Sequence, residues 1–396
     1  MVSKACVVGA YQRKLEELAA CGVDLTVVVP PYWQEETRRI QLERLHTHGY
    51  RLVVEPIRFN GRFHLFHFPG LGRAIRDLRP DIVHADEEPY NPATWQMIHL
   101  ARRYGARSLF FTWQNLYRRY LPPFSWIERY CFGIADRAIA GNAEAVQVLR
   151  RKDFAKPIDV IPQFGVDPEI FRPSAVSDQP SARSYQSSVI SHQSSSQNSE
   201  LRIQNPPEHS EPRTQNSFRV GFVGRLVEQK GVLDLLEAAA RLKRDYAVVL
   251  VGAGPLQPAI ETRATELGMR DRVEMLGGVP SDRMPEILNT LDVLVLPSRT
   301  RPNWKEQFGR ALVEAMACEV PVVGSDSGEI PNVIGDVGLI FPEGNVDALA
   351  THLEALRGSP ELRSTLGARG RARVLERFTQ TRIAEQTYRV YREMLG

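Results

Sequence analysis

The sequence predicts an α/β protein with two doubly wound domains. Short β-branched runs alternate with longer helical stretches along most of the 396 residues, which is the pattern of repeated β-α-β units. Strand candidates such as DLTVVVP and YAVVLVG are continuous apolar runs, and this favours parallel strands buried on both faces. The length points the same way, because domains average roughly 150 residues.

Seven strand candidates precede residue 173, with helical patterns between many of them. The strand candidates are residues 4–9, 24–30, 51–56, 81–85, 107–112, 137–142 and 157–162. The helical patterns include residues 13–21, 92–104 and 143–152. These elements predict an N-terminal Rossmann-like domain over residues 1–172.

The same alternation returns after residue 217. Its strand candidates are residues 218–224, 246–252, 272–277, 291–297, 320–324 and 337–341. Helical patterns fall at residues 232–244, 258–267, 310–318 and 347–356, and the stretch 360–395 also looks helical. We expect a C-terminal domain over residues 218–375 and a separate C-terminal helix over residues 376–396.

A change of composition separates the two domains. Residues 173–217 are mostly Ser, Gln, Asn and Pro, with few large apolar side chains. Ordering such a segment would cost backbone entropy with little burial in return, so we interpret it as a flexible linker. The alternative is a functional lid.

The overall composition excludes several classes of protein. Fifty basic and forty-seven acidic residues leave a formal charge of +3, which argues against a nucleic-acid-binding protein. The four cysteines are scattered and form no CxxC pair, so they predict neither a disulfide framework nor a metal site. The N-terminus lacks a signal-peptide pattern, and no apolar run approaches the ~20 residues of a membrane span. We expect a cytoplasmic protein.

Two segments that follow strands carry the candidate chemistry. After the strand at 218–224, GRLVEQKG places Gly224, Arg225 and Lys230 in a tight turn before a helix, where two cations and free N–H groups suit a diphosphate.

After the strand at 291–297, Glu306 should lie in a loop and Glu314 in the first turns of the next helix. Such carboxylates can accept hydrogen bonds from sugar hydroxyls. Backbone N–H groups at the start of this helix face an anion; they come from Gln307, Phe308 and Gly309.

The ordered set GRLVEQKG, VGAGP, VEMLGGVP and LPSR…KEQFGRALVEAMACEVPVVGSDSGEIPNVI resembles the family-four retaining glycosyltransferases of GT-B fold. The resemblance is strong over residues 218–342 and weaker over residues 1–172, where IPQFGVDPEIFRP looks like the family's domain junction. It implies two facing Rossmann-like domains, with the nucleotide-sugar donor on the C-terminal domain and the acceptor on the N-terminal domain. The last helix would cross back onto the N-terminal domain.

The resemblance also assigns roles residue by residue. Arg225 and Lys230 would hold the donor diphosphate and stabilise its departure, so that no metal is needed. Glu306 would contact the transferred sugar, and Glu314 would accept hydrogen bonds from the ribose. Backbone contacts to the sugar and phosphate would come from Phe308 and Gly309.

Two positions of the N-terminal domain depart from the family's pattern. The family often has a histidine near the donor sugar where this chain has Gln114. Glutamine can hydrogen-bond a hydroxyl but cannot carry a proton at neutral pH, so a histidine-dependent step is in doubt. The family's Gly-Gly turn is replaced by Gly9-Ala10-Tyr11, which makes a close approach of the donor less certain there.

Two further segments leave alternatives open. The stretch 84–96 offers Glu87, Glu88, Tyr90 and Asn91 after a strand, either as an acceptor site or, for Asn91, as a helix cap before Pro92. The stretch 116–133 interleaves aromatic residues with arginines. It could rest on an anionic membrane surface at the inner face, or its aromatics could pack in the core.

These observations predict a glycosyltransferase that moves a sugar from a nucleotide-diphosphate sugar to a hydroxyl acceptor with retention of configuration. The acceptor would be a sugar or a lipid-linked sugar, and no cofactor or metal is expected. Two alternatives remain: a nucleotide-sugar-binding protein without activity, which the substitution at Gln114 motivates, and a GT-B nucleotide-sugar epimerase.

Overall fold

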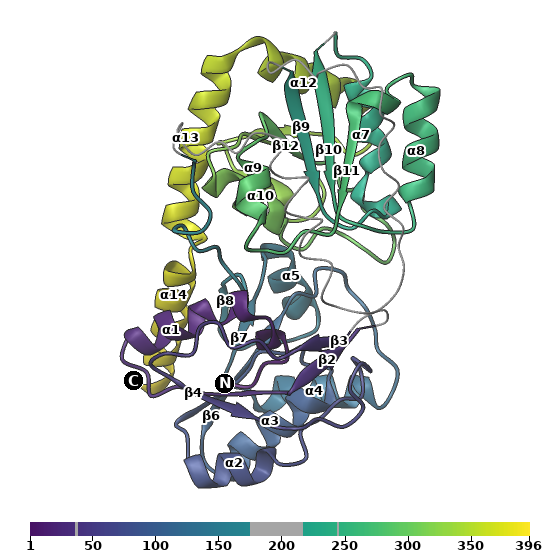
Figure 1. Cartoon of the computed structure of the whole chain (residues 1–396). Helices are drawn as coiled ribbons and strands as arrows, with labels where there is room; N and C mark the ends of the chain where they lie inside the picture. The colour runs from purple at the N-terminus through teal and green to yellow at the C-terminus, as the bar shows by residue number, and fades with distance from the viewer. Residues whose placement is uncertain (36–38, 175–216, 244) are drawn as a thin grey trace.

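The structure is a computed structural model of the chain, and it describes residues 1–35, 39–174, 217–243 and 245–396. Two α/β domains face each other, as the sequence predicts (Figure 1). The segment expected to be a linker lies, apart from its two ends, outside the described residues.

The C-terminal domain is built on a six-stranded parallel sheet. Its strands are β9 (Phe218–Val223), β10 (Tyr246–Val251), β11 (Val273–Gly277), β12 (Val293–Leu296), β13 (Val322–Ser325) and β14 (Leu339–Phe341). They lie in the order β11-β10-β9-β12-β13-β14, and every neighbouring pair is parallel. The order reverses between β9 and β12, so a crevice is expected beyond the carboxyl ends of these two strands.

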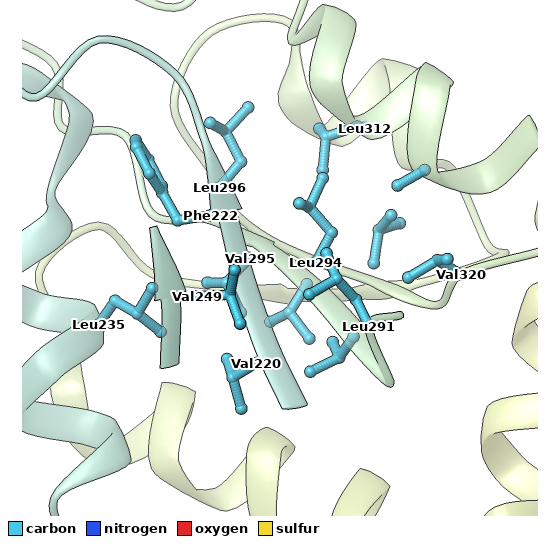
Figure 2. Packing of buried hydrophobic residues seen from close by; sticks show 14 of the residues in the cluster. Val220, Phe222, Leu235, Val249, Leu291, Leu294, Val295, Leu296, Leu312 and Val320 are labelled. Atoms are coloured by element: carbon cyan, nitrogen blue, oxygen red, sulfur yellow. The ribbon is translucent and has the colours of Figure 1, made fainter. Parts of the chain in front are cut away.

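Helices and a continuous apolar core hold this sheet in place. The helices are α7 (Val232–Ala239), α8 (Gln257–Glu266), α9 (Met284–Leu288), α10 (Arg310–Ala317), α11 (Ile330–Ile334), α12 (Val346–Gly358) and α13 (Pro360–Arg377). Figure 2 shows buried side chains of β9, β10 and β12 packed together with Leu235 of α7 and Leu312 of α10. Because this core is closely packed, it fixes where the strands end and their loops begin.

The N-terminal domain has the same doubly wound topology, but its sheet is less continuous at the centre. Its parallel strands are β1 (Thr26–Val29), β4 (Arg51–Val54), β5 (Ile82–Ala85), β6 (Arg107–Thr112), β7 (Arg137–Ala140) and β8 (Ile158–Val160). The ladders β4-β1 and β5-β6-β7-β8 are joined through Val2, which makes parallel bridges to Val28 and Ala85.

The prediction of a strand at residues 4–9 is wrong. This segment forms two 3₁₀ turns, η1 (Ala5–Val7) and η2 (Gly9–Tyr11). Immediately after Val2, the side chains of Ser3 and Lys4 bond to acidic residues of the loop after β5, which draws the chain out of the sheet. The apolar residues Cys6 and Val7 are buried from the turn instead of from a strand.

In the described part of the N-terminal domain, five helices accompany the sheet: α1 (Arg13–Ala20), α2 (Leu71–Leu78), α3 (Pro92–Arg103), α4 (Phe124–Ile134) and α5 (Ala143–Arg151). An antiparallel hairpin of β2 (Tyr32–Gln34) and β3 (Arg39–Gln41) was not predicted. The last helix, α14 (Gln380–Leu395), packs against α1 of the N-terminal domain, and Thr379 bridges to Val166 just before it (Figure 1).

Membrane spans were searched over the described residues. None of the helices there is both long enough and apolar enough to cross a bilayer.

Candidate functional site

Two of the predicted donor-side residues, Lys230 and Glu306, meet beyond the carboxyl ends of β9 and β12, where the strand order reverses. Lys230 Nζ donates to Glu306 Oε2 at 2.6 Å, although the two residues are 76 positions apart in the chain. Ser298 Oγ donates to the same carboxylate oxygen at 2.8 Å. The sheet topology therefore places a cation and a carboxylate together at the edge of the sheet where doubly wound folds bind their ligands.

Local backbone geometry positions Lys230. It ends a single 3₁₀ turn, η5 (Glu228–Lys230), and Gly231 follows with φ of 67°. A Cβ at Gly231 would lie 1.8 Å from the carbonyl oxygen of Pro297, so only glycine fits against the end of β12. The Lys230 ammonium also lies 5.1 Å from the centre of the Trp304 ring.

Glu306 is 7% exposed and is held from both domains. Its backbone carbonyl accepts a hydrogen bond from Asn115 Nδ2 of the N-terminal domain at 3.1 Å. Lys230 and Ser298 both use Oε2, and among the described residues Oε1 receives no hydrogen bond. The carboxylate is therefore oriented by the protein and keeps one oxygen for a hydroxyl donor.

Glu314 lies on α10, whose first residue follows Gly309, a left-handed residue with φ of 78°. Arg310 Nε donates to Glu314 Oε1 at 2.6 Å, and the Arg310 guanidinium lies 5.0 Å from the ring centre of Tyr11. Burial acts to lower the pKa of Arg310, but Glu314 and Tyr11 outweigh it and raise that pKa. Tyr11 also stacks on Phe164 at 3.9 Å, so aromatic rings fill the place of the expected Gly-Gly turn.

Arg225 and Gly224 lie in the turn after β9. Arg225 is exposed, and its guanidinium makes no hydrogen bond or ion pair to any described residue, so it is free to meet an anion. Gly224 closes the end of the strand, because its amide donates to Val251 and its carbonyl lies against Gly252.

Gln307 and Phe308 lie at the interface between the domains. Gln307 Nε2 donates to the Trp113 carbonyl at 3.0 Å, and the Gln307 carbonyl accepts from Asn142 Nδ2 at 3.0 Å. The Phe308 ring lies 5.8 Å from each of the Trp113 and Phe378 rings. Their side chains join the domains, and any donor contact from these residues would come from their backbone.

Among the acceptor-side candidates, Glu88 has the most reactive environment. Thr112 Oγ1 donates to Glu88 Oε2 at 2.7 Å, and the Trp113 amide donates to Oε1 at 2.8 Å. Burial raises the pKa of Glu88 to about 7 in spite of these bonds. A carboxyl group that titrates near neutral pH can both give and accept a proton.

The other candidates of this loop differ from Glu88. Glu87 is buried with both oxygens bonded to Lys4, by the amide at 3.0 Å and by Nζ at 2.6 Å. Tyr90 is buried beside Tyr120, with ring centres 4.3 Å apart. Asn91 precedes α3 but its side chain makes no capping bond, and both of its buried polar atoms lack a partner among the described residues.

Gln114 is engaged within the N-terminal domain. Its Nε2 donates to the Tyr120 hydroxyl at 3.0 Å, and its Oε1 accepts from Lys152 Nζ at 3.1 Å. Lys152 is in turn paired with Glu128 at 2.6 Å. The structure therefore does not bring Gln114 into contact with Lys230 or Glu306.

Sequence reasoning missed several residues of the site. Ser298 follows β12 after Pro297, and this position could have singled it out. Asn115 and Tyr11 reach the site through contacts between the domains, which no local pattern shows. By contrast, the spacing of Arg310 and Glu314 on one helix could have paired them. Within the described residues no group of three or more His, Cys, Asp or Glu side chains could hold a metal ion.

Each domain matches a family model. Residues 12–170 match the model of Glycosyltransferase Family 4, and residues 206–373 match that of glycosyl transferases group 1. Together with the GT-B architecture described above, these matches show that the protein belongs to the group 1 glycosyltransferase family.

Curated relatives share parts of the sequence. Alpha-maltose-1-phosphate synthase of Mycolicibacterium smegmatis is 34% identical over 190 residues, or 44% of this chain and 48% of that protein. N-acetyl-alpha-D-glucosaminyl L-malate synthase of Bacillus anthracis is 35% identical over 42% of this chain and 43% of its own length. The chain thus aligns with less than half the length of each of these two relatives.

Solved structures share the whole fold. HepE of Anabaena, in complex with UDP, superposes with a TM-score of 0.71 at 18% identity and covers 99% of this chain and 98% of its own. Sucrose-phosphate synthase of Thermosynechococcus elongatus gives 0.68 at 21% identity, over 97% of this chain and 92% of its own. At these identities the likeness establishes the GT-B fold.

Proposed function

We propose that the protein is a glycosyltransferase that moves a sugar from a nucleotide-diphosphate sugar to a hydroxyl acceptor, with retention of configuration and without a metal. The observation that carries this proposal is the contact of Lys230 and Ser298 with Glu306 at the switch point of the C-terminal sheet. The pair offers a cation for phosphate and a carboxylate oxygen for a sugar hydroxyl in one place.

The leaving group sets the electrostatic requirement. As the bond between the sugar and the diphosphate breaks, negative charge builds on the phosphate oxygens. Lys230 and the unpaired Arg225 follow β9, and the N-terminus of α10 begins at Gly309 after β12. Two cations and the free N–H groups of a helix start supply this stabilisation from the chain itself.

The kind of donor is supported by the relatives. HepE of Anabaena is described in complex with UDP, with UDP and glucose, and with UDP-glucose, on the fold that this chain shares. We assign the donor site of this chain to the same crevice, with Glu314 and Arg310 beside the ribose. Retention of configuration follows from the resemblance to the retaining family.

Glu88 is the strongest acceptor-side candidate. Its raised pKa and its bonds to Thr112 and Trp113 would let it orient an acceptor hydroxyl from the N-terminal side. Glu87 is less suited, because Lys4 already occupies both of its oxygens. The engaged side chain of Gln114 supports a structural role for that residue.

The first experiment is thermal unfolding with UDP, GDP and ADP and then with their sugars. A ligand at ~100 times its dissociation constant stabilises the folded state by about 2.7 kcal/mol. One nucleotide should raise the midpoint, and Glu314→Ala should abolish the rise. No shift with any nucleotide would contradict the donor site.

The reaction itself is tested with the donor that binds. Incubation with EDTA should leave turnover unchanged, and the anomeric coupling constant of the product should match that of the donor. Inversion of the anomeric centre would contradict retention. Donor binding without turnover of a panel of sugar and lipid-linked acceptors would favour the non-catalytic alternative, and conversion of the donor without an acceptor would favour the epimerase.

A further inference from the structure

The start of helix α4 exposes large apolar side chains to solvent. Leu121 is 80% exposed and Trp126 is 63% exposed. They belong to the segment 116–133, for which the sequence left open either packing in the core or contact with a membrane surface. The structure divides that segment: Tyr120 and Tyr130 pack inward on other rings, whereas Leu121 and Trp126 point away from the core. Leu121 lies just before α4 and Trp126 lies in its first turn, and two exposed apolar side chains of this size so close together call for a partner.

Neighbouring segments extend this surface. On one side, the His64 ring lies 5.5 Å from Phe124 in the first turn of α4, and the next residue, Leu65, is partly exposed. On the other side, the partly exposed Trp95 of α3 lies 6.2 Å from Tyr130 of α4. Helices α3 and α4 pack side by side on the N-terminal domain (Figure 1). We call this surface the α4 patch, and it comprises Leu65, Trp95, Leu121 and Trp126.

The charge around the α4 patch is almost entirely positive. Its surroundings in the sequence are residues 60–72, 92–107 and 117–130, and they contain a single acidic residue, Glu128, which Lys152 neutralises at 2.6 Å. The same three ranges contain Arg62, Arg102, Arg103, Arg107, Arg118, Arg119 and Arg129. All seven arginines are exposed, although Arg107 is paired with Asp136 at 3.0 Å and Arg118 donates to the Asn303 carbonyl.

We propose that the α4 patch docks the N-terminal domain onto the surface of an anionic lipid bilayer. Tryptophan and leucine can enter the boundary between headgroups and acyl chains, while surrounding arginines meet the phosphates. Each arginine near an anionic membrane surface strengthens binding by roughly fivefold. Exposed apolar side chains on segments that also carry exposed arginines fit this partner better than they fit an acidic protein surface, which would leave Trp126 and Leu121 without apolar contact.

The patch adjoins the acceptor side of the site. Tyr120, next to Leu121 in the chain, packs its ring against Tyr90 and bonds to Gln114. If the proposed function holds, docking through the α4 patch would therefore present these residues to an acceptor anchored in the bilayer. The docking itself does not depend on transfer, so it is tested without donor or acceptor.

The test is flotation of the purified full chain with vesicles of phosphatidylcholine alone or with 30% phosphatidylglycerol. We expect binding to the phosphatidylglycerol vesicles that weakens as salt rises, because the arginine contribution is screened. Quenching of tryptophan fluorescence by brominated lipid should accompany binding and should fall strongly in Trp126→Ala.

Two paired variants separate the apolar and the basic contributions. Leu121→Ala with Trp126→Ala should weaken vesicle binding by about tenfold. Arg119→Ala with Arg129→Ala should do the same, and only at low salt. Matched controls are Leu375→Ala with Leu395→Ala, which are also exposed but lie on α13 and α14, and Arg382→Ala with Arg389→Ala on α14. The controls should bind as the parent does.

Several results would overturn the proposal. They are no binding to phosphatidylglycerol vesicles at low salt, equal binding by the Leu121/Trp126 variant and the parent, and equal losses in the control variants. Sedimentation velocity tests whether a second copy of the chain covers the α4 patch instead. If the protein bound no vesicles but formed a concentration-dependent dimer, and the Leu121/Trp126 variant did not, the patch would be an interface between two copies. Since the substituted side chains are exposed, unchanged thermal unfolding excludes misfolding as the cause.

Discussion

The two domains place the same pair of residue types at the same topological position, but use them differently. In the C-terminal domain, Lys230 follows the first strand, β9, and reaches Glu306 after the fourth, β12, at 2.6 Å. In the N-terminal domain, Lys4 follows Val2, which occupies the place of a first strand, and reaches Glu87 after β5, also at 2.6 Å. Both pairs lie where the strand order of their sheet reverses.

The surroundings decide what each pair can do. The carboxylate of Glu87 is 1% exposed, both of its oxygens are bonded to Lys4, and aromatic rings such as Phe63 surround the lysine. Glu306 is bonded on one oxygen and keeps the other free. A doubly wound fold therefore supplies the position, and the remaining hydrogen-bonding capacity determines whether the pair supports the fold or is available to a ligand.

The sharpest test of this contrast is Lys4→Met. It should lower the free energy of unfolding by about 3–5 kcal/mol, because removal of one partner leaves the other buried and unpaired. Urea denaturation at pH 7 measures the loss. Donor binding by the folded protein should be unchanged; a stable variant with weakened donor binding would show that the N-terminal pair acts on the ligand.

Lys230→Ala should show the opposite pattern. We expect turnover to fall by about 10²–10³-fold, or about 3–4 kcal/mol of transition-state stabilisation, since a cation that meets the leaving diphosphate is lost. Arg241→Ala, which removes an exposed cation elsewhere on the same domain, is the matched control. Near-parental turnover of Lys230→Ala with the donor at saturation would show that the pair is structural in both domains.

The C-terminal half of this comparison could be predicted from the sequence. Its site residues occur in short stretches after strands, and the alternating pattern places those strands correctly because burial on both faces leaves continuous apolar runs. Lys230, Glu306 and Glu314 could each be located by counting from a strand or a helix start. Their meeting follows from the topology of the sheet.

The N-terminal half could not be predicted in the same way. The apolar run at residues 4–9 looks like a strand, yet bonds from Ser3 and Lys4 to the loop after β5 turn it into 3₁₀ structure. The hydrogen bond from Asn115 to the Glu306 carbonyl spans 191 positions, and the engagement of Gln114 by Lys152 leaves no local signal. Where function depends on contacts between distant segments, periodicity and spacing carry too little information.

Glu88 offers a test within the N-terminal domain that depends on pH. Burial raises its pKa to about 7 from an ordinary 4.5, so the folded state holds a proton that the unfolded state has released between these values. The stabilising proton is bound at pH 4 and is lost as the pH rises through 7, so the unfolding free energy should fall by at most about 3 kcal/mol over that range.

Glu88→Gln should flatten this slope, which urea denaturation at pH 4 to 8 measures. Glu87, whose pKa burial also raises, remains in the variant and leaves a residual slope. Glu266→Gln, at an exposed position of the C-terminal domain, is the control. An identical slope in Glu88→Gln and the parent would mean that Glu88 is already ionised in the fold and cannot exchange protons near pH 7.

Asn115→Ala should have the smallest effect, and it measures how the N-terminal domain acts on the C-terminal pair. Loss of one buried hydrogen bond to the Glu306 carbonyl costs about 1 kcal/mol, so we expect kcat to fall about fivefold. Nucleotide binding should not change, because Asn115 positions Glu306 and does not touch the nucleotide. Asn115→Asp keeps the shape, removes the N–H donor and adds a negative charge against the Glu306 carbonyl, so it should lower kcat at least as much. A weakened nucleotide affinity with unchanged kcat would instead place Asn115 in the donor site itself. Both domains, and not the C-terminal domain alone, would then bind the donor.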